Sequence, residues 1–340
     1  MNALITGGGG FIGSHLVDSQ LALGHRVRTV DLQAERLAHV VHHPDLEVVV
    51  GDIRDQALMQ GLVEGIDVVY HLASAHLDVT LSHAHYWAVN VEATTNLLQV
   101  AHQAGVQRVV HCSSVGVIGD VKNPPADENS ACHPTNIYEW TKLAGEQAAL
   151  QFAGKTGFPI VVARPAWVYG PSCPRTQKLF RTIGKGQFVM FGNGRTLRHP
   201  IYVSDAVRGL ELCAETESVT GQVYIIAGKK PVTIETLVRM IAEVLEVRPP
   251  AVRLPVSVGK TAGHALQLAF GLLGRQPPFS RRSLDFFLKD NAYDISKAEC
   301  ELGFHPRVDL RAGLIETLHW LNGQSNEKLK QHGFESVEYE

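Results

Sequence analysis

The chain has 340 residues, of which 45% are hydrophobic and 19% are charged, and its formal net charge is −3 at pH 7. This composition is typical of a soluble globular protein, and the charge gives no basic surface for nucleic acid. The five cysteines form no CxxC pair and no disulfide framework, which favours a reducing cytoplasm. No apolar run of about 18 residues lacks polar interruptions, so we expect no membrane-spanning helix.

The chain begins with a buried-strand pattern that runs directly into a glycine-rich turn. Residues 2–6 are mostly apolar, and Gly7, Gly10 and Gly13 follow at three-residue spacing before the helical pattern Ser14–Ala22. Glycine permits the tight strand-to-helix turn, and its missing Cβ lets a pyrophosphate reach the backbone at the helix N-terminus. The turn therefore predicts a dinucleotide site.

An acidic residue indicates which dinucleotide binds. The second strand pattern, Arg26–Val30, ends on Asp31. A carboxylate here suits the ribose 2′-hydroxyl of NAD and repels the 2′-phosphate of NADP. We therefore expect NAD, although Arg36 is close enough in sequence to weaken the discrimination.

Strand and helix patterns then alternate, which predicts parallel strands joined by right-handed crossovers. The fold class is α/β: a Rossmann-type doubly wound parallel sheet with a smaller C-terminal substrate lobe. Further strands are expected at Leu46–Val50, Val68–Ala73, Arg108–Cys112 and Ile160–Ala163, with helices at Tyr86–Ala104 and Tyr138–Ala153.

The regular alternation stops after residue 165, which suggests a division of the chain. We expect an NAD-binding domain in residues 1–165, with a return segment at 199–228. The substrate-binding lobe would comprise residues 166–198 and 229–322. The polar residues 323–340 show no periodicity and are expected to form a mobile tail.

Val256–Leu273 has the pattern of an amphipathic helix. It could be a lid or core element, a protein interface or a membrane-surface contact, and its thin cationic face disfavours anionic lipid. The expected apolar stripe consists of Ala262, Ala265, Leu266, Ala269, Phe270 and Leu273.

Histidines cluster in two parts of the chain, but no HExxH or comparable ligand spacing is present, so no metal site is expected. The clusters are His39, His42 and His43, and His71, His76, His83 and His85.

Three residues form a candidate catalytic set. Tyr138 and Lys142 are four apart in a helical segment and share one face. A tyrosine with its usual pKa of about 10 becomes a base only if that pKa falls, and a nearby ammonium has the required sign. A serine after the strand Arg108–Cys112 could hold the substrate oxygen, and spacing alone does not choose between Ser113 and Ser114.

Together these residues resemble the extended short-chain dehydrogenase/reductase family, of the NAD-dependent epimerase/dehydratase type, over residues 1 to about 322. The motifs that carry the resemblance are Thr6-Gly7-x-x-Gly10-x-x-Gly13, Asp31, Gly51-Asp52-Ile53, His71-Leu72-Ala73, Asn90, Ser113-Ser114, Tyr138-x-x-x-Lys142 and Arg164-Pro165.

The resemblance implies roles for individual residues. Ser114 aligns with the catalytic serine or threonine, and Lys142 would bind the nicotinamide ribose and lower the pKa of Tyr138. Asp52 and Ile53 would contact the adenine. The implied cofactor-binding set is Gly7, Gly10, Phe11, Ile12, Gly13, Asp31, Asp52, Ile53, Leu72, Ala73, Asn90, Tyr138, Lys142 and Pro165.

Val115 and Gly116 stand where related dehydratases and decarboxylases carry acids, which leaves epimerisation or simple oxidation and reduction. Arg198, before the segment Ile201–Asp205, resembles the arginine that binds the diphosphate of nucleotide sugars. Trp167 stands where nucleotide-sugar epimerases carry asparagine. The segment Arg164–Pro171 instead resembles the 3β-hydroxysteroid and sterol dehydrogenase branch.

These features favour an epimerase or oxidoreductase acting on a nucleotide-activated sugar. The alternative is a dehydrogenase of a sterol-like or other apolar alcohol, and a minor alternative is a non-catalytic NAD-binding protein. The substrate-binding candidates are Ser114, Trp167 and Arg198.

The resemblance also implies a homodimer. The two long helices, Tyr86–Ala104 and Tyr138–Ala153, would pair across a two-fold axis, unless their apolar residues only cover the sheet of the same chain. The apolar residues in question are Val89, Ala93, Leu97, Leu98, Leu143, Ala144 and Ala148.

Overall fold

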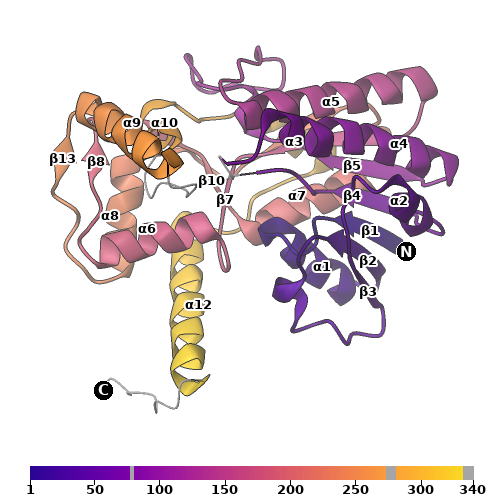
Figure 1. Cartoon of the computed structure of the whole chain (residues 1–340), viewed down its shortest axis with the longest axis horizontal. Coiled ribbons are helices and arrows are strands. Elements are labelled where there is room, and N and C mark those ends of the chain that lie inside the picture. Colours follow the sequence, from indigo (N-terminus) through magenta and orange to yellow (C-terminus); the bar gives the residue numbers. More distant parts are fainter. Residues whose placement is uncertain (77–79, 273–280, 332–340) are drawn as a thin grey trace.

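The computed structural model describes residues 1–76, 80–272 and 281–331, and among these residues the main body is a seven-stranded, all-parallel sheet (Figure 1). This confirms the expected Rossmann-type fold class. In spatial order the strands are β3 (Leu46–Val50), β2 (Arg26–Asp31), β1 (Asn2–Thr6), β4 (Val68–His71), β5 (Arg108–Cys112), β6 (Ile160–Pro165) and β11 (Val223–Ile226).

The strand order reverses at β1, which pairs with β2 on one side and with β4 on the other. In an open parallel sheet a ligand binds outside the carboxyl ends of the strands at this reversal. The glycine turn follows β1 at that point, so the topology places it where a dinucleotide is expected.

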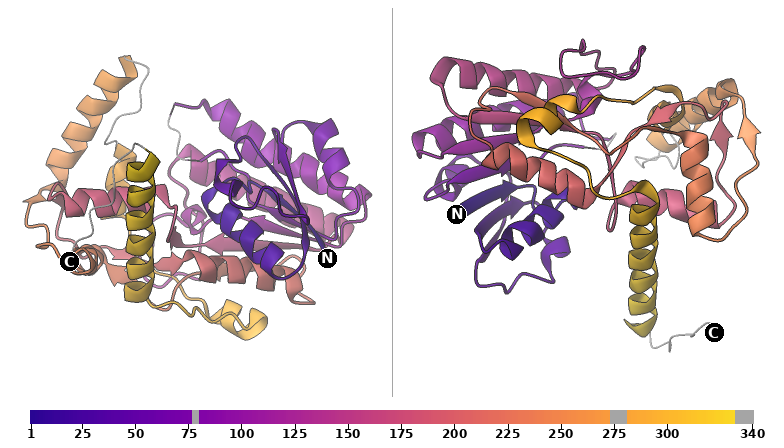
Figure 2. Two further views of the ribbon diagram at one scale, coloured as in Figure 1. Left: turned by 90° about the horizontal axis from the view of Figure 1, so that it is seen from below. Right: turned by 180° about the vertical axis from the view of Figure 1, so that it is seen from behind.

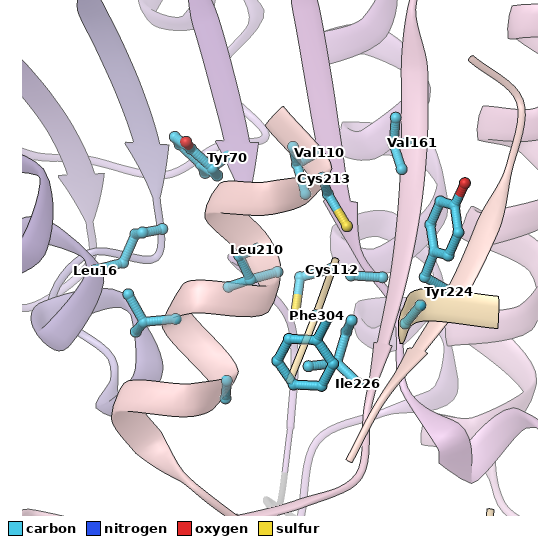
Figure 3. Packing of buried hydrophobic residues seen from close by; sticks show 14 of the residues in the cluster. Leu16, Tyr70, Val110, Cys112, Val161, Leu210, Cys213, Tyr224, Ile226 and Phe304 are labelled. Atoms are coloured by element: carbon cyan, nitrogen blue, oxygen red, sulfur yellow. The ribbon is translucent and has the colours of Figure 1, made fainter. Parts of the chain in front are cut away.

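Helices cover both faces of the sheet. One face carries α1 (Phe11–Ala22) and α7 (Val203–Glu215), and the other carries α2 (Gln56–Leu62), α4 (Ala93–Gln103) and α5 (Ile137–Thr156) (Figure 1). Figure 3 shows how Leu210 and Cys213 of α7 lie against Val110 and Cys112 of the sheet, beside the ring of Phe304 from the C-terminal part of the chain.

The expected helix over 86–104 is divided in the structure. α3 (His83–Trp87) leads into η2 (Ala88–Glu92), a π-helical turn, and α4 follows. Such turns insert an extra residue into a helix and frequently lie at functional sites. Here the turn brings Asn90 inward, where it is 3% exposed.

Three of the seven apolar residues expected at a two-fold contact lie in this chain's own core. Ala93, Leu97 and Leu98 are buried in the core beneath α4. The homodimer stays a prediction, and the exposed apolar side chains on that side are Trp87 of α3 and Trp140 of α5, at 45% and 55% exposure.

Figure 2 shows a second lobe beside the sheet, and this lobe has its own core. It is built from α6 (Pro174–Gly184), α8 (Ile234–Val244) and α12 (Leu310–Gln331), and includes Phe180, Leu237 and Leu314 among its buried residues. The remaining elements are β7 (Trp167–Tyr169), β8 (Met190–Phe191), β9 (Leu197–Arg198), β10 (Pro200–Tyr202), β12 (Val232–Thr233), β13 (Arg253–Leu254), α9 (Val256–Leu272), α10 (Arg281–Leu288), α11 (Ser296–Leu302), η1 (Glu35–Leu37) and η3 (Val115–Val117).

Two C-terminal expectations differ from the structure. α12 continues to Gln331, past position 322 where the sequence pattern ended, and residues 332–340 lie outside the described part. α9 buries Gly259 and Gly263, whereas Ala262 and Ala265 of the expected stripe are exposed.

The reason is steric: a Cβ on Gly259 would lie 2.7 Å from Leu284, so glycines let α10 approach closely. Two members of the expected stripe cannot be compared: Leu273 lies outside the described residues, and the side chain of Ala269 is not described.

No helix in the described ranges is long and apolar enough to cross a membrane. Within those ranges there is likewise no group of three or more His, Cys, Asp or Glu residues that could hold a metal ion.

Candidate active site and cofactor site

The glycine turn is closed to side chains. Gly7 adopts a φ of +77°, and a Cβ there would lie 2.6 Å from the amide nitrogen of Ala73. A Cβ on Gly13 would lie 2.0 Å from the carbonyl oxygen of Gly7, and one on Gly10 would lie 3.0 Å from the same atom. The backbone at the N-terminus of α1 is therefore bare, as a bound pyrophosphate requires.

Two further glycines are equally constrained, which the sequence reasoning did not foresee. A Cβ on Gly8 would lie 1.8 Å from Thr29 Oγ1, and one on Gly9 would lie 1.9 Å from the carbonyl oxygen of Gln33. The run of four glycines is thus fixed by its contacts with β2 and the loop that follows.

Asp31 ends β2 beside this turn. Burial raises the pKa of its carboxyl, and the backbone amides of Gln33, Leu32, Gly9 and Gly10 oppose that rise. Arg36 Nη1 lies 3.4 Å from the carbonyl oxygen of Gly9. The acid and the cation therefore both border the expected position of the adenosine ribose.

The other predicted cofactor residues lie at the carboxyl edge of the sheet or beside it. Phe11 and Ile12 are half-buried in the first turn of α1, Leu72 and Ala73 follow β4, and Pro165 ends β6.

Asp52 and Ile53 follow β3. Asp52 forms an ion pair of 2.5 Å with Arg54, whose hydrogen bonds lower the pKa of the carboxyl, and Ile53 is buried.

Lys142 lies on α5, which begins at the cap formed by Asn136 accepting a hydrogen bond from the Glu139 amide. The Nζ of Lys142 donates to the carbonyl oxygen of Cys112 at 2.6 Å. Burial lowers the pKa of this ammonium from its usual value. The bond ties α5 to the end of β5, with Tyr138 one turn earlier on the same helix.

The two adjacent serines differ in their surroundings. Ser113 is buried and donates to Glu146 Oε2 at 2.6 Å. Ser114 is half-buried, and its Oγ accepts from the amide of Gly116 at 3.0 Å. The geometry thus supports Ser114 as the serine that a substrate reaches.

Glu146 also holds a buried ion pair that fastens α5 to β6. Its Oε1 lies 2.5 Å from Arg164 Nη2, and both side chains are at most 5% exposed. Removing one partner of such a pair leaves an uncompensated buried charge. Ser113, Glu146 and Arg164 therefore hold α5 against β5 and β6.

Asn90 bonds to protein groups on both sides. Its Oδ1 accepts from the amide of Ala75 at 2.8 Å, and its Nδ2 donates to Thr141 Oγ1 at 2.9 Å. The side chain therefore connects the loop after β4 to α5, immediately beside Lys142. This bridging arrangement positions elements around the cofactor site.

Two buried histidines lie behind Lys142. His71 contacts Thr6 Oγ1 at 2.7 Å and Thr94 Oγ1 at 2.9 Å. The ring of His111 lies 5.4 Å from it, and neither nitrogen of His111 has a hydrogen-bond partner among the described residues. Burial and the nearby Lys142 lower both pKa values, to about 3 for His71, so both rings are neutral.

The structure gives Arg198 contacts within the protein that the sequence did not predict. The side chain is 6% exposed, and its Nε and Nη2 donate to the carbonyl oxygens of Phe286 and Asp285 in α10. Its guanidinium carbon lies 4.8 Å from the ring centroid of Phe286, and burial lowers its pKa to about 10. Arg198 therefore anchors α10.

Trp167 is half-buried beside this anchor. Its ring centroid lies 6.2 Å from that of Phe286 and 6.1 Å from that of Tyr169. Phe287 contacts Phe191 and Phe286 in turn. The lobe thus presents an aromatic group next to the arginine that the sequence had assigned to phosphate.

Comparison with known proteins identifies the class. The model of the NAD dependent epimerase/dehydratase family matches residues 3–227, and the chain belongs to this family.

The relatives span different substrates. A 3 beta-hydroxysteroid dehydrogenase/Delta 5-->4-isomerase from Mycobacterium tuberculosis is 30% identical, over 93% of this chain and 89% of the relative. The N-acetyl-alpha-D-glucosaminyl-diphospho-ditrans,octacis-undecaprenol 4-epimerase of Escherichia coli O157:H7 is 26% identical, over 94% and 95%. A dTDP-glucose 4,6-dehydratase from Streptomyces venezuelae, solved with NAD, is 27% identical with a TM-score of 0.81, over 96% and 98%.

NAD is the cofactor of this family, and the described residues fit it. A bare glycine turn meets a helix N-terminus at the strand reversal, and Asp31 borders it. The protein is therefore an NAD-dependent enzyme of the extended short-chain dehydrogenase/reductase type.

Proposed function

We propose that the protein is an NAD-dependent dehydrogenase acting on a secondary alcohol carried by an apolar, sterol-like skeleton. The observation that carries this choice is the position of Arg198, which is buried and bonded to the carbonyl groups of α10. A nucleotide sugar would need that guanidinium for its diphosphate. The aromatic group around Trp167 and Phe286 suits an apolar ring system instead.

The catalytic roles follow from the arrangement on β5 and α5. Ser114 would hold the substrate oxygen by a hydrogen bond, and Tyr138 would take the hydroxyl proton. The Lys142 ammonium, held by the Cys112 carbonyl, favours the phenolate form of Tyr138 by its charge. When bound, NAD supplies the acceptor for the hydride that leaves the carbinol carbon.

A second candidate, epimerisation of a sugar attached to a diphosphate, is favoured by a different observation. Val115 and Gly116 provide no acid beside Ser114, so the site suits reactions that need only hydride and proton transfer. The relative from Escherichia coli is named for a sugar joined to both a diphosphate and a polyprenol. Such a substrate would require Arg198 to leave the α10 carbonyls.

Thermal denaturation of the NAD-loaded protein separates these candidates. A 3β-hydroxysteroid should raise the melting temperature, whereas UDP and dTDP should leave it unchanged. Stabilisation by a nucleotide that disappears in Arg198→Lys, with the steroid inactive, would overturn the proposal in favour of the epimerase. A steroid effect accompanied by NADH formation would establish it.

A further inference from the structure

Two residues outside the predicted site form a chain of contacts that ends at Tyr138. Arg175 contacts His76, and His76 contacts the Tyr138 ring. The imidazole of His76, on the loop after β4, lies with its centroid 4.4 Å from that of the Tyr138 ring, tilted by 54°. His76 Nε2 lies 3.2 Å from Nη2 of Arg175, in the first turn of α6. The chain of contacts therefore joins the Rossmann body, the catalytic helix and the second lobe.

The contact with Arg175 determines which ring nitrogen of His76 accepts the hydrogen bond. An arginine guanidinium donates hydrogen bonds and cannot accept them. At this contact Nε2 is therefore the acceptor, and the ring proton lies on Nδ1. The imidazole of His76 thus contacts both the phenol ring of Tyr138 and the guanidinium of Arg175.

Other charged groups on α5 and α10 already have bonding partners, so the positive charge of Arg175 can act on the pKa of Tyr138 in addition to theirs. Lys142 lies one turn along α5, and its ammonium is bonded to the Cys112 carbonyl. Glu139, the next residue after Tyr138, forms an ion pair of 3.3 Å with Lys289, which also contacts Asp285 at 3.1 Å. The carboxylate nearest in sequence to Tyr138 is therefore already paired with a cation.

We propose that His76 and Arg175 are positioning residues for Tyr138. His76 fixes the phenol ring by a tilted ring-to-ring contact, and Arg175 holds His76 in place and adds a positive charge that favours the phenolate. The proposal rests on the proposed role of Tyr138 as base. It makes that base depend on both lobes, because Arg175 belongs to α6 and His76 to the sheet edge.

The test reads Tyr138 directly, without a substrate. Carbon-13 NMR of ring-labelled tyrosine in the NAD-loaded protein, with the resonance assigned by Tyr138→Phe, gives the apparent pKa of the phenol. The variants are Arg175→Ala, His76→Ala and His76→Phe, which keeps a ring but removes the acceptor. Arg181→Ala, an exposed arginine on the same helix, is the matched control.

Arg175→Ala and His76→Ala should each raise the apparent pKa of Tyr138 by about half a unit or more, with the control unchanged. His76→Phe should show the same rise, because Arg175 loses its anchor.

With whichever substrate the enzyme turns over, His76→Ala should lower kcat about tenfold, and His76→Phe should recover most of that loss by restoring the ring-to-ring contact. The dissociation constant of NAD should be the same in all variants.

An unchanged Tyr138 pKa in both alanine variants would overturn the proposal. Parallel losses of NAD affinity and melting temperature in His76→Phe, a conservative change at an exposed position, would also do so, because they indicate a purely structural role. A normal turnover in Tyr138→Phe would instead contradict the proposed function and leave the measured pKa effects standing.

Discussion

Gly145 of α5 lies directly against Asn90 of the π-helical turn: a Cβ on Gly145 would fall 2.3 Å from the Asn90 carbonyl oxygen. The contact involves backbone, so a side chain cannot be accommodated by a change of rotamer. It sets the distance between the catalytic helix and the turn that carries Asn90. Any residue larger than glycine must push the two apart.

Gly145→Ala should therefore destabilise the protein by about 1–3 kcal/mol, although alanine is the better helix former. Gly154 is a control in the same helix, because nothing lies within 4 Å of its Cβ position. Gly154→Ala should stabilise by about 0.5–1 kcal/mol. Urea denaturation measures both, and equal effects in the two variants would contradict the close approach.

The burial of His111 makes the free energy of unfolding depend on pH. Burial keeps its folded-state pKa well below the usual 6.5, while the unfolded chain titrates near that value. Below pH 6.5 the unfolded state binds the proton and the folded state does not, so the free energy of unfolding falls as pH falls, by up to about 1.4 kcal/mol per pH unit. Above pH 6.5 both states are neutral and His111 adds no pH dependence.

His111→Phe keeps the shape of the ring and removes two buried nitrogens that have no partner among the described residues. Its stability at pH 7 should equal or exceed that of the parent, and its decline between pH 6.5 and 5 should be shallower. Denaturant titrations at several pH values measure this. An identical slope in the two proteins would show that His111 takes up its proton in the folded state.

Asp31 should make NADH bind more tightly than NADPH, by about 1–3 kcal/mol, because its carboxylate faces the 2′-phosphate with like charge. Asp31→Asn should reduce the difference in affinity between NADH and NADPH, because Arg36 lies against Gly9 and can then approach the 2′-phosphate. Arg36→Ala in the Asp31→Asn background should remove that gain. Calorimetry measures the affinity of each variant for NADH and for NADPH. Equal affinities in the parent protein would contradict the role of Asp31.

Arg198→Ala should destabilise the fold by about 2–3 kcal/mol, because the carbonyl groups of Asp285 and Phe286 lose a charged donor. Arg195→Ala is the control, since Arg195 is an exposed neighbour on the same segment. Chemical denaturation with NAD present measures the difference. A fully stable Arg198→Ala protein would mean that the anchor on α10 contributes nothing.

The sequence patterns were sufficient for the features that depend on local spacing. The glycine turn, Asp31 at the end of β2 and the Tyr138–Lys142 spacing all follow from strand and helix periodicity, and the sheet itself was predicted in this way. Asn90 was expected near the cofactor, but its bridging bonds to Ala75 and Thr141 depend on a π-helical turn that has no sequence signature.

The remaining features depend on contacts between distant parts of the chain. His76 and Arg175 are 99 residues apart, and Arg198 meets α10 across 88 residues. Neither pair shares a periodic pattern. The contacts of Arg198 with α10 were not predicted, because a guanidinium can bind either a phosphate or the carbonyl groups at a helix C-terminus.

The role of Tyr138 as the base is the central claim, and Tyr138→Phe tests it most directly. Turnover of the alcohol by the NAD-loaded enzyme should fall by about 10²-fold or more, because the proton acceptor is lost while the ring is kept. Ser114→Ala should have a smaller effect, since only one hydrogen bond to the substrate oxygen is lost. NAD affinity and melting temperature should match the parent in both variants. Near-normal turnover in Tyr138→Phe would contradict the mechanism.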